Sequence, residues 1–312
     1  MNVLITGAAG FIGNGLLRKL AADHRVTCII REKNEHTADT VSSSHRCFFG
    51  DVTDLPFMKR VIATAEPEII FHMACQSIVR MCARNPVDAY HTNVMGTVTL
   101  LDAIRQVGDT VRSVVVSTSD KAYGHALPPY EEETPFLPKF TYEATKAAQD
   151  IVCQNYFHKY SSPVRIARLC NVYGPNDPND SRLIPNTINR ALAGLPPVIY
   201  EDVADFRREF IFIDDALTAL IKIATDGTDG EAYCVGGVGD TPPLTIRDVT
   251  TMIMEACGMK GNEFDVPKRH HHFREIECQY MRALKIRKLG WEQMTSLKSG
   301  IKKTIEWKRS KN

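Results

Sequence analysis

The sequence predicts an α/β fold in which a doubly wound parallel sheet carries a second, smaller α/β domain. Short, almost wholly apolar segments alternate with amphipathic stretches through the first half of the 312 residues. Strands that are apolar on both faces belong in parallel sheets that helices cover on both sides. In addition, glycines follow the first strand directly, which indicates a phosphate-binding turn at the edge of this sheet.

The expected elements follow one another in a regular order. After Gly174 the alternation loosens and Pro, Asn and Asp accumulate, but EFIFI and EAYCVGG still have strand character. We therefore expect a first domain over 1–172, with a sheet completed by part of 205–240, and a second region over 173–312. The expected strands are NVLITG, VTCIIR, CFFGDV, EIIFHMA, VRSVVVSTS and VRIARLCNVYG, and the expected helices lie near 11–22, 55–65, 89–107 and 142–160.

The composition is that of an ordinary globular protein. A formal net charge of +1 favours neither nucleic acid nor a membrane surface as a partner. No segment reaches the roughly 18 apolar residues of a membrane span, and MNVLITGAAGFIG lacks the features of a signal peptide. The nine cysteines show no CxxC pair and no metal-ligand spacing, so we expect reduced thiols in a cytoplasmic protein. Three adjacent histidines in KRHHHF, 268–273, cannot all face one ion, and we predict no metal.

The segment ITGAAGFIG places Gly7, Gly10 and Gly13 between the first strand and the helix that follows. Small residues let the backbone approach a pyrophosphate, and the helix N-terminus offers free N–H groups. Glycines that serve only a tight turn are the alternative. The strand–helix–strand context favours a Rossmann-type dinucleotide-binding domain, with Phe11 and Ile12 also at the cofactor.

The end of the second strand bears on the choice between NAD and NADP. An acidic residue there would bind the adenosine ribose and indicate NAD, but the sequence has Ile30 and Arg31. Arg31 could pair with a 2′-phosphate, so NADP is favoured. NAD stays open because Glu32 could bind ribose or repel that phosphate. Asp51 and Val52 end the third strand, where adenine would lie, unless Asp51 only caps the next helix.

Five polar residues form the predicted catalytic group. Tyr142 and Lys146 in FTYEATKAAQD are four apart on an expected helix and therefore share a face. A free phenol titrates near about 10, and a neighbouring ammonium and an oxidised nicotinamide would both favour the phenolate, making Tyr142 a usable base. The strand VVVSTS ends at Ser119, followed by Asp120 and Lys121, where open α/β sheets place ligand chemistry.

With these motifs the chain resembles the extended short-chain dehydrogenase/reductase family of nucleotide-sugar epimerases and dehydratases over essentially its whole length. In that family a bound cofactor oxidises carbon 4 of a nucleotide-diphosphate sugar and returns the hydride. The resemblance implies that Ser119 and Tyr142 handle the proton of the 4-hydroxyl and that Lys146 binds the nicotinamide ribose, with Met73 and Ala74 beside the cofactor. The matching segments are TGAAGFIG, GDVTD, FHMACQS, NVMGTVTLLDA, STSDKAYG, YEATK, ARLCNVYGP, RREFIFIDD and KIRKLGW.

The residues after Ser119 imply the reaction type. In 4,6-dehydratases of the family an Asp protonates the leaving 6-hydroxyl and a Glu removes the proton from carbon 5. Asp120 and Lys121 resemble the CDP-glucose 4,6-dehydratase variant, although Ala122 and Tyr123 depart from that branch. Simpler interpretations are a turn cap for Asp120 and, for Lys121, a solvated lysine or a partner of YEEE. We expect a nucleotide-sugar 4,6-dehydratase with Lys121 as the base. The alternative is a 4-epimerase, and a non-catalytic NADP-binding regulator is remote.

The resemblance also implies how 173–312 binds substrate. Cations and amide donors suit a diphosphate at a domain cleft. If Arg208 points inward, Arg207 must point away. In this family the helices near 89–107 and 142–160 form a dimer interface, so we expect a homodimer, although ordinary burial would explain their apolar stripes nearly as well. The expected substrate contacts are Ser77, Asn171, Arg182, Leu183, Tyr200 and Arg208, with Arg274 and Glu277 closing the pocket.

Overall fold

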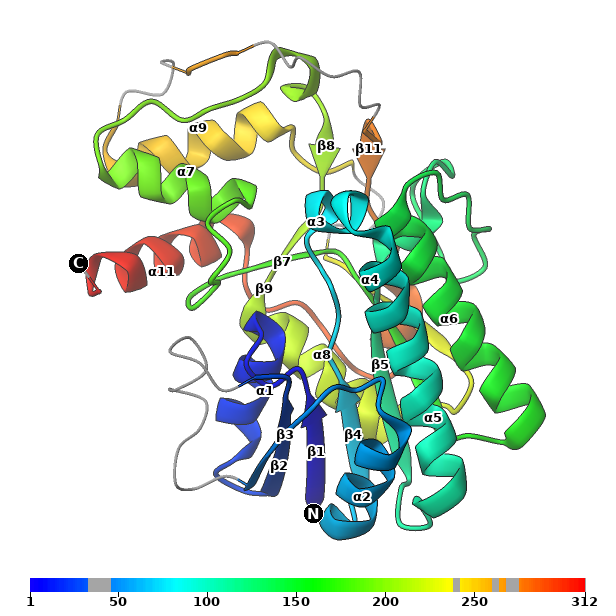
Figure 1. The fold of residues 1–312 in the computed structure, drawn as a ribbon. Coiled ribbons are helices and arrows are strands. Elements are labelled where there is room, and N and C mark those ends of the chain that lie inside the picture. The colour runs from blue at the N-terminus through cyan, green and yellow to red at the C-terminus, as the bar shows by residue number, and fades with distance from the viewer. Residues whose placement is uncertain (33–45, 238–241, 260–263, 268–274, 312) are drawn as a thin grey trace.

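The computed structural model describes residues 1–32, 46–237, 242–259, 264–267 and 275–311. Its centre is a seven-stranded sheet with the order β10-β6-β5-β4-β1-β2-β3, in which each neighbouring pair is parallel (Figure 1). The predicted doubly wound parallel sheet is thus confirmed. The strands are β1 (Asn2–Thr6), β2 (Arg25–Ile30), β3 (Arg46–Phe49), β4 (Ile69–His72), β5 (Ser113–Ser119), β6 (Val164–Leu169) and β10 (Ala232–Val235).

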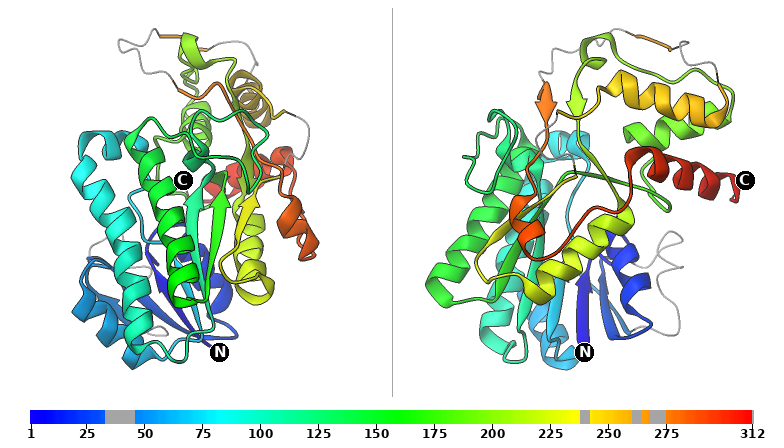
Figure 2. Two further views of the ribbon diagram at one scale, coloured as in Figure 1. Left: turned by 90° about the vertical axis from the view of Figure 1, so that its right-hand side faces the viewer. Right: turned by 180° about the vertical axis from the view of Figure 1, so that it is seen from behind.

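Helices cover both faces of this sheet, as Figures 1 and 2 show. On β1, Leu4 faces a core shared with α2 and α5, and Ile5 faces one shared with α1 and α8. Because side chains alternate along a strand, a strand between two helical layers must be apolar throughout. The helices of the two layers are α1 (Phe11–Leu20), α2 (Leu55–Ala65), α5 (Gly96–Val107), α6 (Thr141–Tyr160) and α8 (Ile213–Asp226).

The order of the strands reverses between β1 and β4, which are neighbours in the sheet. Connections leave the two strands toward opposite sides at such a point, so the carboxyl ends of the strands open a crevice there. Above this edge lie α7 and α9, which pack against each other, with α11 beside α9 (Figure 1). The elements of this upper part are β7 (Asn171–Tyr173), α7 (Leu183–Leu192), η4 (Glu201–Val203), β8 (Arg207–Arg208), β9 (Phe210–Phe212), α9 (Ile246–Cys257), β11 (Cys278–Gln279) and α11 (Leu297–Arg309).

The two strand-like segments of the second half have different fates. EFIFI supplies β9, which pairs with β7 in a separate two-stranded sheet. EAYCVGG supplies β10, which returns to the edge of the main sheet beside β6. A short helix, α10 (Leu284–Lys288), packs against β10. The chain therefore leaves the main sheet after β6 and comes back to it before the upper part is complete.

The helix expected near 89–107 is interrupted. The chain forms α4 (Pro86–Tyr90), then a π-helical turn, η2 (His91–Met95), and only then α5. Within that turn the buried Asn93 side chain accepts a hydrogen bond from Gln76 N and donates to the Gln76 carbonyl and to Thr145 Oγ1. Turns of this kind occur often at functional sites. This one joins α6 to the loop that follows β4, and that loop leads into α3 (Val79–Arg84).

No helix within the described ranges is long and apolar enough to span a bilayer.

Candidate active site

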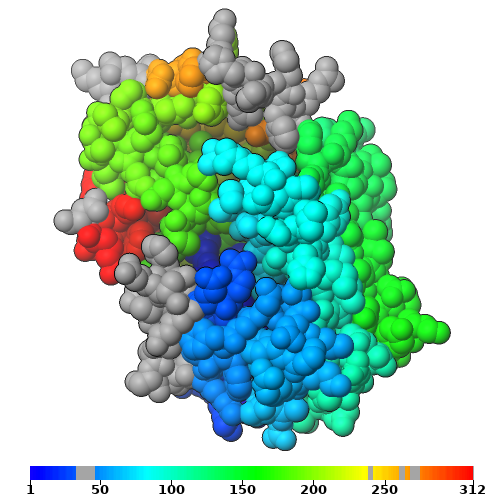
Figure 3. Space-filling view, in the orientation of Figure 1, coloured from blue at the N-terminus to red at the C-terminus, as the bar shows by residue number. Residues whose placement is uncertain are grey.

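A cavity of about 700 Å³ lies at the carboxyl ends of the strands, below the upper elements. Figure 3 shows the corresponding hollow between the yellow-green upper segments and the blue and cyan lower ones. Its size falls in the range of ligand pockets. The predicted residues that line it are Gly7, Gly10, Phe11, Ile12, Gly13, Met73, Ser77, Ser119, Asp120, Lys121, Tyr142, Lys146, Asn171, Arg182, Leu183, Tyr200 and Arg208.

Four predicted cofactor residues lie outside this lining. Arg31 is largely exposed and forms an ion pair of 3.6 Å with Glu32. Asp51 accepts hydrogen bonds from Thr53, while the N-cap of α2 is Asp54, so Asp51 does not cap that helix. Val52 is buried.

The fourth residue, Ala74, donates its N–H to the Thr6 hydroxyl. Among the predicted substrate residues, Glu277 is not part of the lining, and its carbonyl accepts hydrogen bonds from Arg207 N and from the Arg208 guanidinium. Arg274 and the segment KRHHHF lie outside the described residues.

The glycine turn is shaped for a close ligand. A Cβ on Gly7 would lie 2.7 Å from Ala74 N, and one on Gly13 would lie 2.2 Å from the Gly7 carbonyl oxygen. Both positions are therefore closed to any side chain. Gly10 is the N-cap of α1 and supplies no side-chain cap, so the first N–H groups of the helix stay available to a ligand at its positive end. The turn thus fits the pyrophosphate of a dinucleotide.

Tyr142 and Lys146 both line the cavity from α6, with the Lys146 Nζ 5.9 Å from the centre of the Tyr142 ring. The Lys146 ammonium donates to the Ser117 carbonyl and to Gln149 Oε1, each at 2.9 Å. Burial raises the pKa of the Tyr142 phenol well above its usual value of about 10, although a hydrogen bond with Ser119 acts in the opposite direction. Burial thus favours the protonated phenol in the protein alone, so the phenolate that we expect depends on the positive charge of an oxidised nicotinamide as well as on Lys146.

Asp120 is buried at the end of β5, where the chain turns into η3 (Asp120–Tyr123). Ser119 is the N-cap of this turn: its hydroxyl accepts from Lys121 N at 3.2 Å and donates to Asp120 Oδ1 at 2.9 Å. The other oxygen, Oδ2, has no hydrogen-bond partner among the described residues. Burial raises the pKa of Asp120 despite the nearby Lys121. A carboxyl group in these surroundings favours its neutral, proton-donating form.

Lys121 lines the same cavity beside Asp120. Burial lowers the pKa of its ammonium, and the Arg208 cation lowers it further, while Asp120 opposes both. Two glutamates of the alternative partner, the YEEE segment, are engaged elsewhere, because Glu131 binds Arg282 and Glu132 accepts from Cys234 N. Lys121 faces the cavity with its pKa displaced toward the neutral amine, which favours the predicted base over a solvated lysine.

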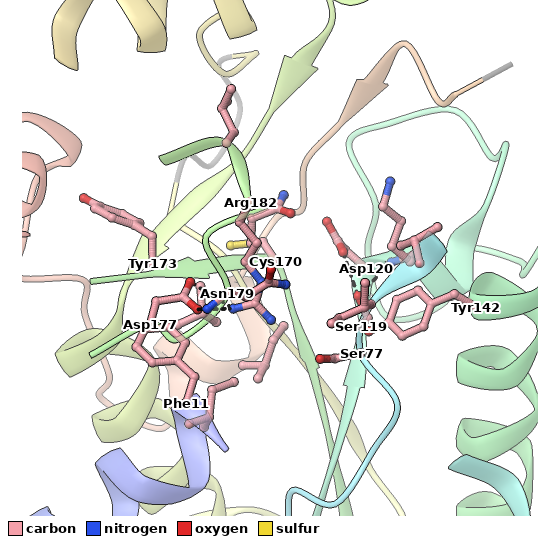
Figure 4. Close-up of a pocket in the computed structure, with 18 of the residues that line it drawn as sticks. Phe11, Ser77, Ser119, Asp120, Tyr142, Cys170, Tyr173, Asp177, Asn179 and Arg182 are labelled. Carbon is pink, nitrogen blue, oxygen red and sulfur yellow. Dashed lines mark hydrogen bonds and ion pairs between the residues drawn. The ribbon is translucent and has the colours of Figure 1, made fainter. Parts of the chain in front are cut away.

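The wall opposite the catalytic group carries the cations. Figure 4 shows Arg182, Asp177 and Asn179 on one side of the cavity and Ser119, Asp120 and Tyr142 on the other. Arg182 contacts both carboxylate oxygens of Asp177, at 3.1 and 3.0 Å.

Arg208, from β8, is buried and lies 3.5 Å from the Glu275 carboxylate. Its neighbour Arg207 is exposed, as strand alternation requires. Tyr200 lies before η4, Leu183 opens α7, and the Asn171 amide donates to the Glu209 carbonyl.

Sequence reasoning missed three residues that matter here. Asp177 and Glu275 line the cavity and hold the two arginines, and Gln149 holds Lys146. Asp177 had a signal, because the run NDPND is rich in residues that bind backbone and cations. Gln149 lies three positions after Lys146 on the same helix, so its spacing also pointed to contact. Glu275 follows directly after 268–274 and carried no such pattern.

Comparisons with known proteins agree with this geometry. The model of the NAD dependent epimerase/dehydratase family matches residues 3–236. The dTDP-glucose 4,6-dehydratase 1 of Escherichia coli is 30% identical over 338 residues, covering 98% of this chain and 92% of the relative. The UDP-glucose 4-epimerase of Mycolicibacterium smegmatis is 32% identical over 322 residues and covers 100% of both chains.

Among solved structures, the dTDP-glucose 4,6-dehydratase DesIV of Streptomyces venezuelae, a double mutant with NAD and DAU bound, superposes with a TM-score of 0.87 at 29% identity. The superposition covers 99% of this chain and 97% of that one. The resemblance inferred from the motifs is confirmed. The family model spans most of the sheet, and the glycine turn and the paired tyrosine and lysine agree with it. The chain therefore belongs to the NAD dependent epimerase/dehydratase family.

Proposed function

We propose that this protein is a nucleotide-sugar 4,6-dehydratase that forms a 4-keto-6-deoxy sugar nucleotide. The observation that carries the proposal is the Asp120 carboxyl, which is buried beside Tyr142 and Lys121, bound to the Ser119 hydroxyl and displaced toward its protonated form. Elimination of a 6-hydroxyl needs an acid at the leaving oxygen, and a neutral buried carboxyl can supply the proton. The dTDP-glucose 4,6-dehydratase relatives support the same reaction.

In this proposal each residue has a defined task with a proton. A nicotinamide dinucleotide, when bound, accepts and returns a hydride. Tyr142 takes the proton of the sugar 4-hydroxyl, and Ser119 turns its single hydroxyl proton from Asp120 to the same oxygen. Asp120 delivers a proton to the departing 6-hydroxyl. Lys121, as the neutral amine, removes the proton from carbon 5, and the resulting ammonium then faces the enolate oxygen.

Lys146 and the glycine turn hold the dinucleotide. The Lys146 ammonium has three N–H donors, of which two bind Ser117 and Gln149. The third is available on the cavity side, where the residue contributes to the lining. The first turn of α1 offers its free N–H groups to the pyrophosphate between Gly7 and Gly13.

A 4-epimerase is the second candidate, because the Mycolicibacterium smegmatis relative carries that name and covers the whole chain. An epimerase would need only Ser119 and Tyr142, and it gives no reason to bury a carboxyl and an amine beside them. A non-catalytic role is disfavoured because Ser119, Tyr142 and Lys146 all line one cavity.

Product mass separates these candidates. The purified protein is incubated with CDP-, dTDP-, UDP- and GDP-linked hexoses, and the nucleotide sugars are analysed by mass spectrometry and NMR. Loss of one water from one substrate is expected. An unchanged mass with inverted configuration at carbon 4 would instead make the protein an epimerase.

We further propose NADP as the preferred cofactor. The Arg31 guanidinium follows β2 directly, where an acidic residue would otherwise bind ribose, and it is exposed enough to meet a 2′-phosphate. Solved relatives that contain NAD support the alternative. Identification of the dinucleotide released on denaturation decides between the two.

We propose a homodimer formed through α5 and α6, which run side by side (Figure 2). Large apolar side chains are exposed on α6 and on the segment leading into α5, and such surfaces often mark interfaces. These apolar residues are Val87, Tyr90, Met95, Ile151 and Tyr160. Light scattering tests this assembly.

We also propose a cytoplasmic location, supported by nine cysteines that are all free thiols in the structure.

A further inference from the structure

A continuous chain of buried hydrogen bonds crosses the sheet beneath the cavity. It begins at the Lys146 ammonium, passes through Gln149 and Thr97, and reaches His72 and Thr6. Each of these five side chains is at most 1% exposed. They come from α6, α5, β4 and β1, and Thr6 directly precedes the glycine turn. The chain therefore connects the catalytic helix with the turn proposed to hold the cofactor.

The donor and the acceptor in each of these hydrogen bonds can be assigned by starting from the Lys146 ammonium. An ammonium can only donate, so the Gln149 oxygen must face it and the Gln149 amide nitrogen must face the other way. That nitrogen donates to Thr97 Oγ1 at 2.8 Å. The single proton of the Thr97 hydroxyl is used by the Asn93 carbonyl at 2.9 Å. Thr97 therefore has only lone pairs to offer its remaining neighbour, His72.

This leaves one arrangement for the imidazole. His72 Nε2 lies 3.2 Å from Thr97 Oγ1 and must carry the proton that it donates there. Nδ1 is 2.9 Å from Thr6 Oγ1, whose hydroxyl donates to it while accepting from Ala74 N at 3.2 Å. Burial and the Lys146 charge lower the pKa of His72 to about 3, in agreement with a neutral ring. Every polar group in the chain is satisfied in this arrangement only.

We propose that Gln149 is a positioning residue for Lys146. We propose further that His72 is held as the neutral Nε2–H tautomer and thereby fixes the donor-to-acceptor direction of the hydrogen bonds that orient Lys146. The proposal deepens the proposed function, because it rests on the role of Lys146 there. With two N–H groups held by Ser117 and Gln149, the ammonium has one donor left and one direction in which to present it. Loss of the Gln149 oxygen would leave the Ser117 carbonyl as the acceptor of this cation among the described residues.

The tautomer is tested by NMR on protein labelled with ¹⁵N-histidine, without any substrate. The His72 signals are those missing from His72→Gln. We expect a protonated Nε2 and an unprotonated Nδ1, unchanged between about pH 5 and about pH 8, where free imidazole titrates. A protonated Nδ1, or a ring that titrates in this interval, would overturn the proposed direction.

Positioning is tested with Gln149→Met, which keeps a long unbranched side chain and removes both hydrogen bonds. We expect kcat to fall about 10- to 100-fold with little change in KM for the nucleotide sugar. We also expect the acidic limb of the pH profile of kcat to move to higher pH, because a less firmly held ammonium stabilises the Tyr142 phenolate less. Gln149→Glu restores the acceptor for Lys146 and should return the limb toward its original position.

The matched control is Gln154→Met, at a glutamine on the same helix that binds Asp150 and does not touch Lys146. It should leave the pH profile in place. Equal profiles for Gln149→Met and Gln154→Met would refute the positioning role, even if both variants lose stability. If no nucleotide sugar is converted by any form, the proposed function fails, and the tautomer measurement still decides the direction of the chain.

Discussion

The Ser119 hydroxyl and the Asp120 carboxyl, neighbours in sequence, are joined by a hydrogen bond of 2.9 Å in which Ser119 donates. Adjacent strand residues normally face opposite ways. Here the strand ends and η3 begins between them, so both side chains turn into one cavity. The arrangement brings an acid beside the hydroxyl that the proposed mechanism places at carbon 4.

Asp120→Asn keeps the shape of the side chain and removes the proton donor. We expect dehydration to fall by about 10²–10⁴-fold, the usual range for a lost general acid. Product mass spectrometry with the best substrate of the panel measures this. Dehydration by the variant at the parent rate would mean that Asp120 is not the acid and that another group protonates the leaving hydroxyl.

The same variant tests the raised pKa of Asp120. An unfolded Asp loses its proton near about pH 4, whereas the folded one keeps it to higher pH. Stability contributed by this group is therefore complete below about pH 4 and is lost as the pH rises toward the folded pKa. At neutral pH we expect Asp120→Asn to be as stable as the parent protein or more stable, by urea unfolding. A marked loss of stability would indicate a carboxylate that is charged and well paired.

Tyr142→Phe should lower turnover by about 10²–10⁴-fold while nucleotide-sugar binding, measured by calorimetry, stays close to that of the parent. The reason is that the ring packing persists and only the proton acceptor is lost. Tyr156→Phe, on the same helix but outside the cavity lining, is the control and should be nearly unaffected. Similar turnover for the two variants would contradict the assignment of Tyr142.

Lys121→Met removes the proposed base and retains the apolar stem. Exchange of the carbon 5 proton with deuterated solvent should drop by at least about 10²-fold. If exchange continues at the parent rate while dehydration slows, Lys121 acts as a cation beside the enolate and the base lies elsewhere. The control Lys139→Met changes a lysine of the loop before α6 that is not part of the lining.

Arg31→Ala addresses the cofactor. A charge-assisted contact to a phosphate contributes about 1.5–3 kcal/mol, so NADP affinity should fall about 10- to 100-fold while NAD affinity changes little. Fluorescence titration of the two dinucleotides gives both constants. An equal effect on NAD and NADP, or none, would remove the support for NADP.

The sheet was predictable because the strands are apolar on both faces and punctuated by turns, a local signal. The strand character of β10 likewise lay in EAYCVGG, whereas its place at the sheet edge depends on pairing with β6. The π turn at His91–Met95 was not predictable, since HTNVM fits an ordinary helix. What distinguishes it is Asn93, whose partners Gln76 and Thr145 come from other parts of the chain.

In the site, the motifs brought the proposed catalytic residues to one cavity because those residues are tied to strand ends and helix faces by short-range geometry. The pKa of Tyr142 depends on more than the motif. The sequence shows a neighbouring cation but not the depth of burial, which raises the pKa of the phenol. The carboxylate partners of Arg182 and Arg208 likewise depend on how distant loops meet.

Both arginines on the substrate side are already engaged, Arg182 with Asp177 and Arg208 with Glu275. An anion that enters the cavity meets cations that are each paired with a carboxylate, and it must compete with that carboxylate or bind the N–H groups that the pair leaves open, such as those of Arg208 Nη2 among the described residues. Ligand binding then becomes an exchange of partners. A ligand that displaces a carboxylate must form stronger contacts with the guanidinium than that carboxylate does. We expect such a site to discriminate against small single anions and its association rate to depend only weakly on ionic strength, because much of its positive charge is compensated within the protein.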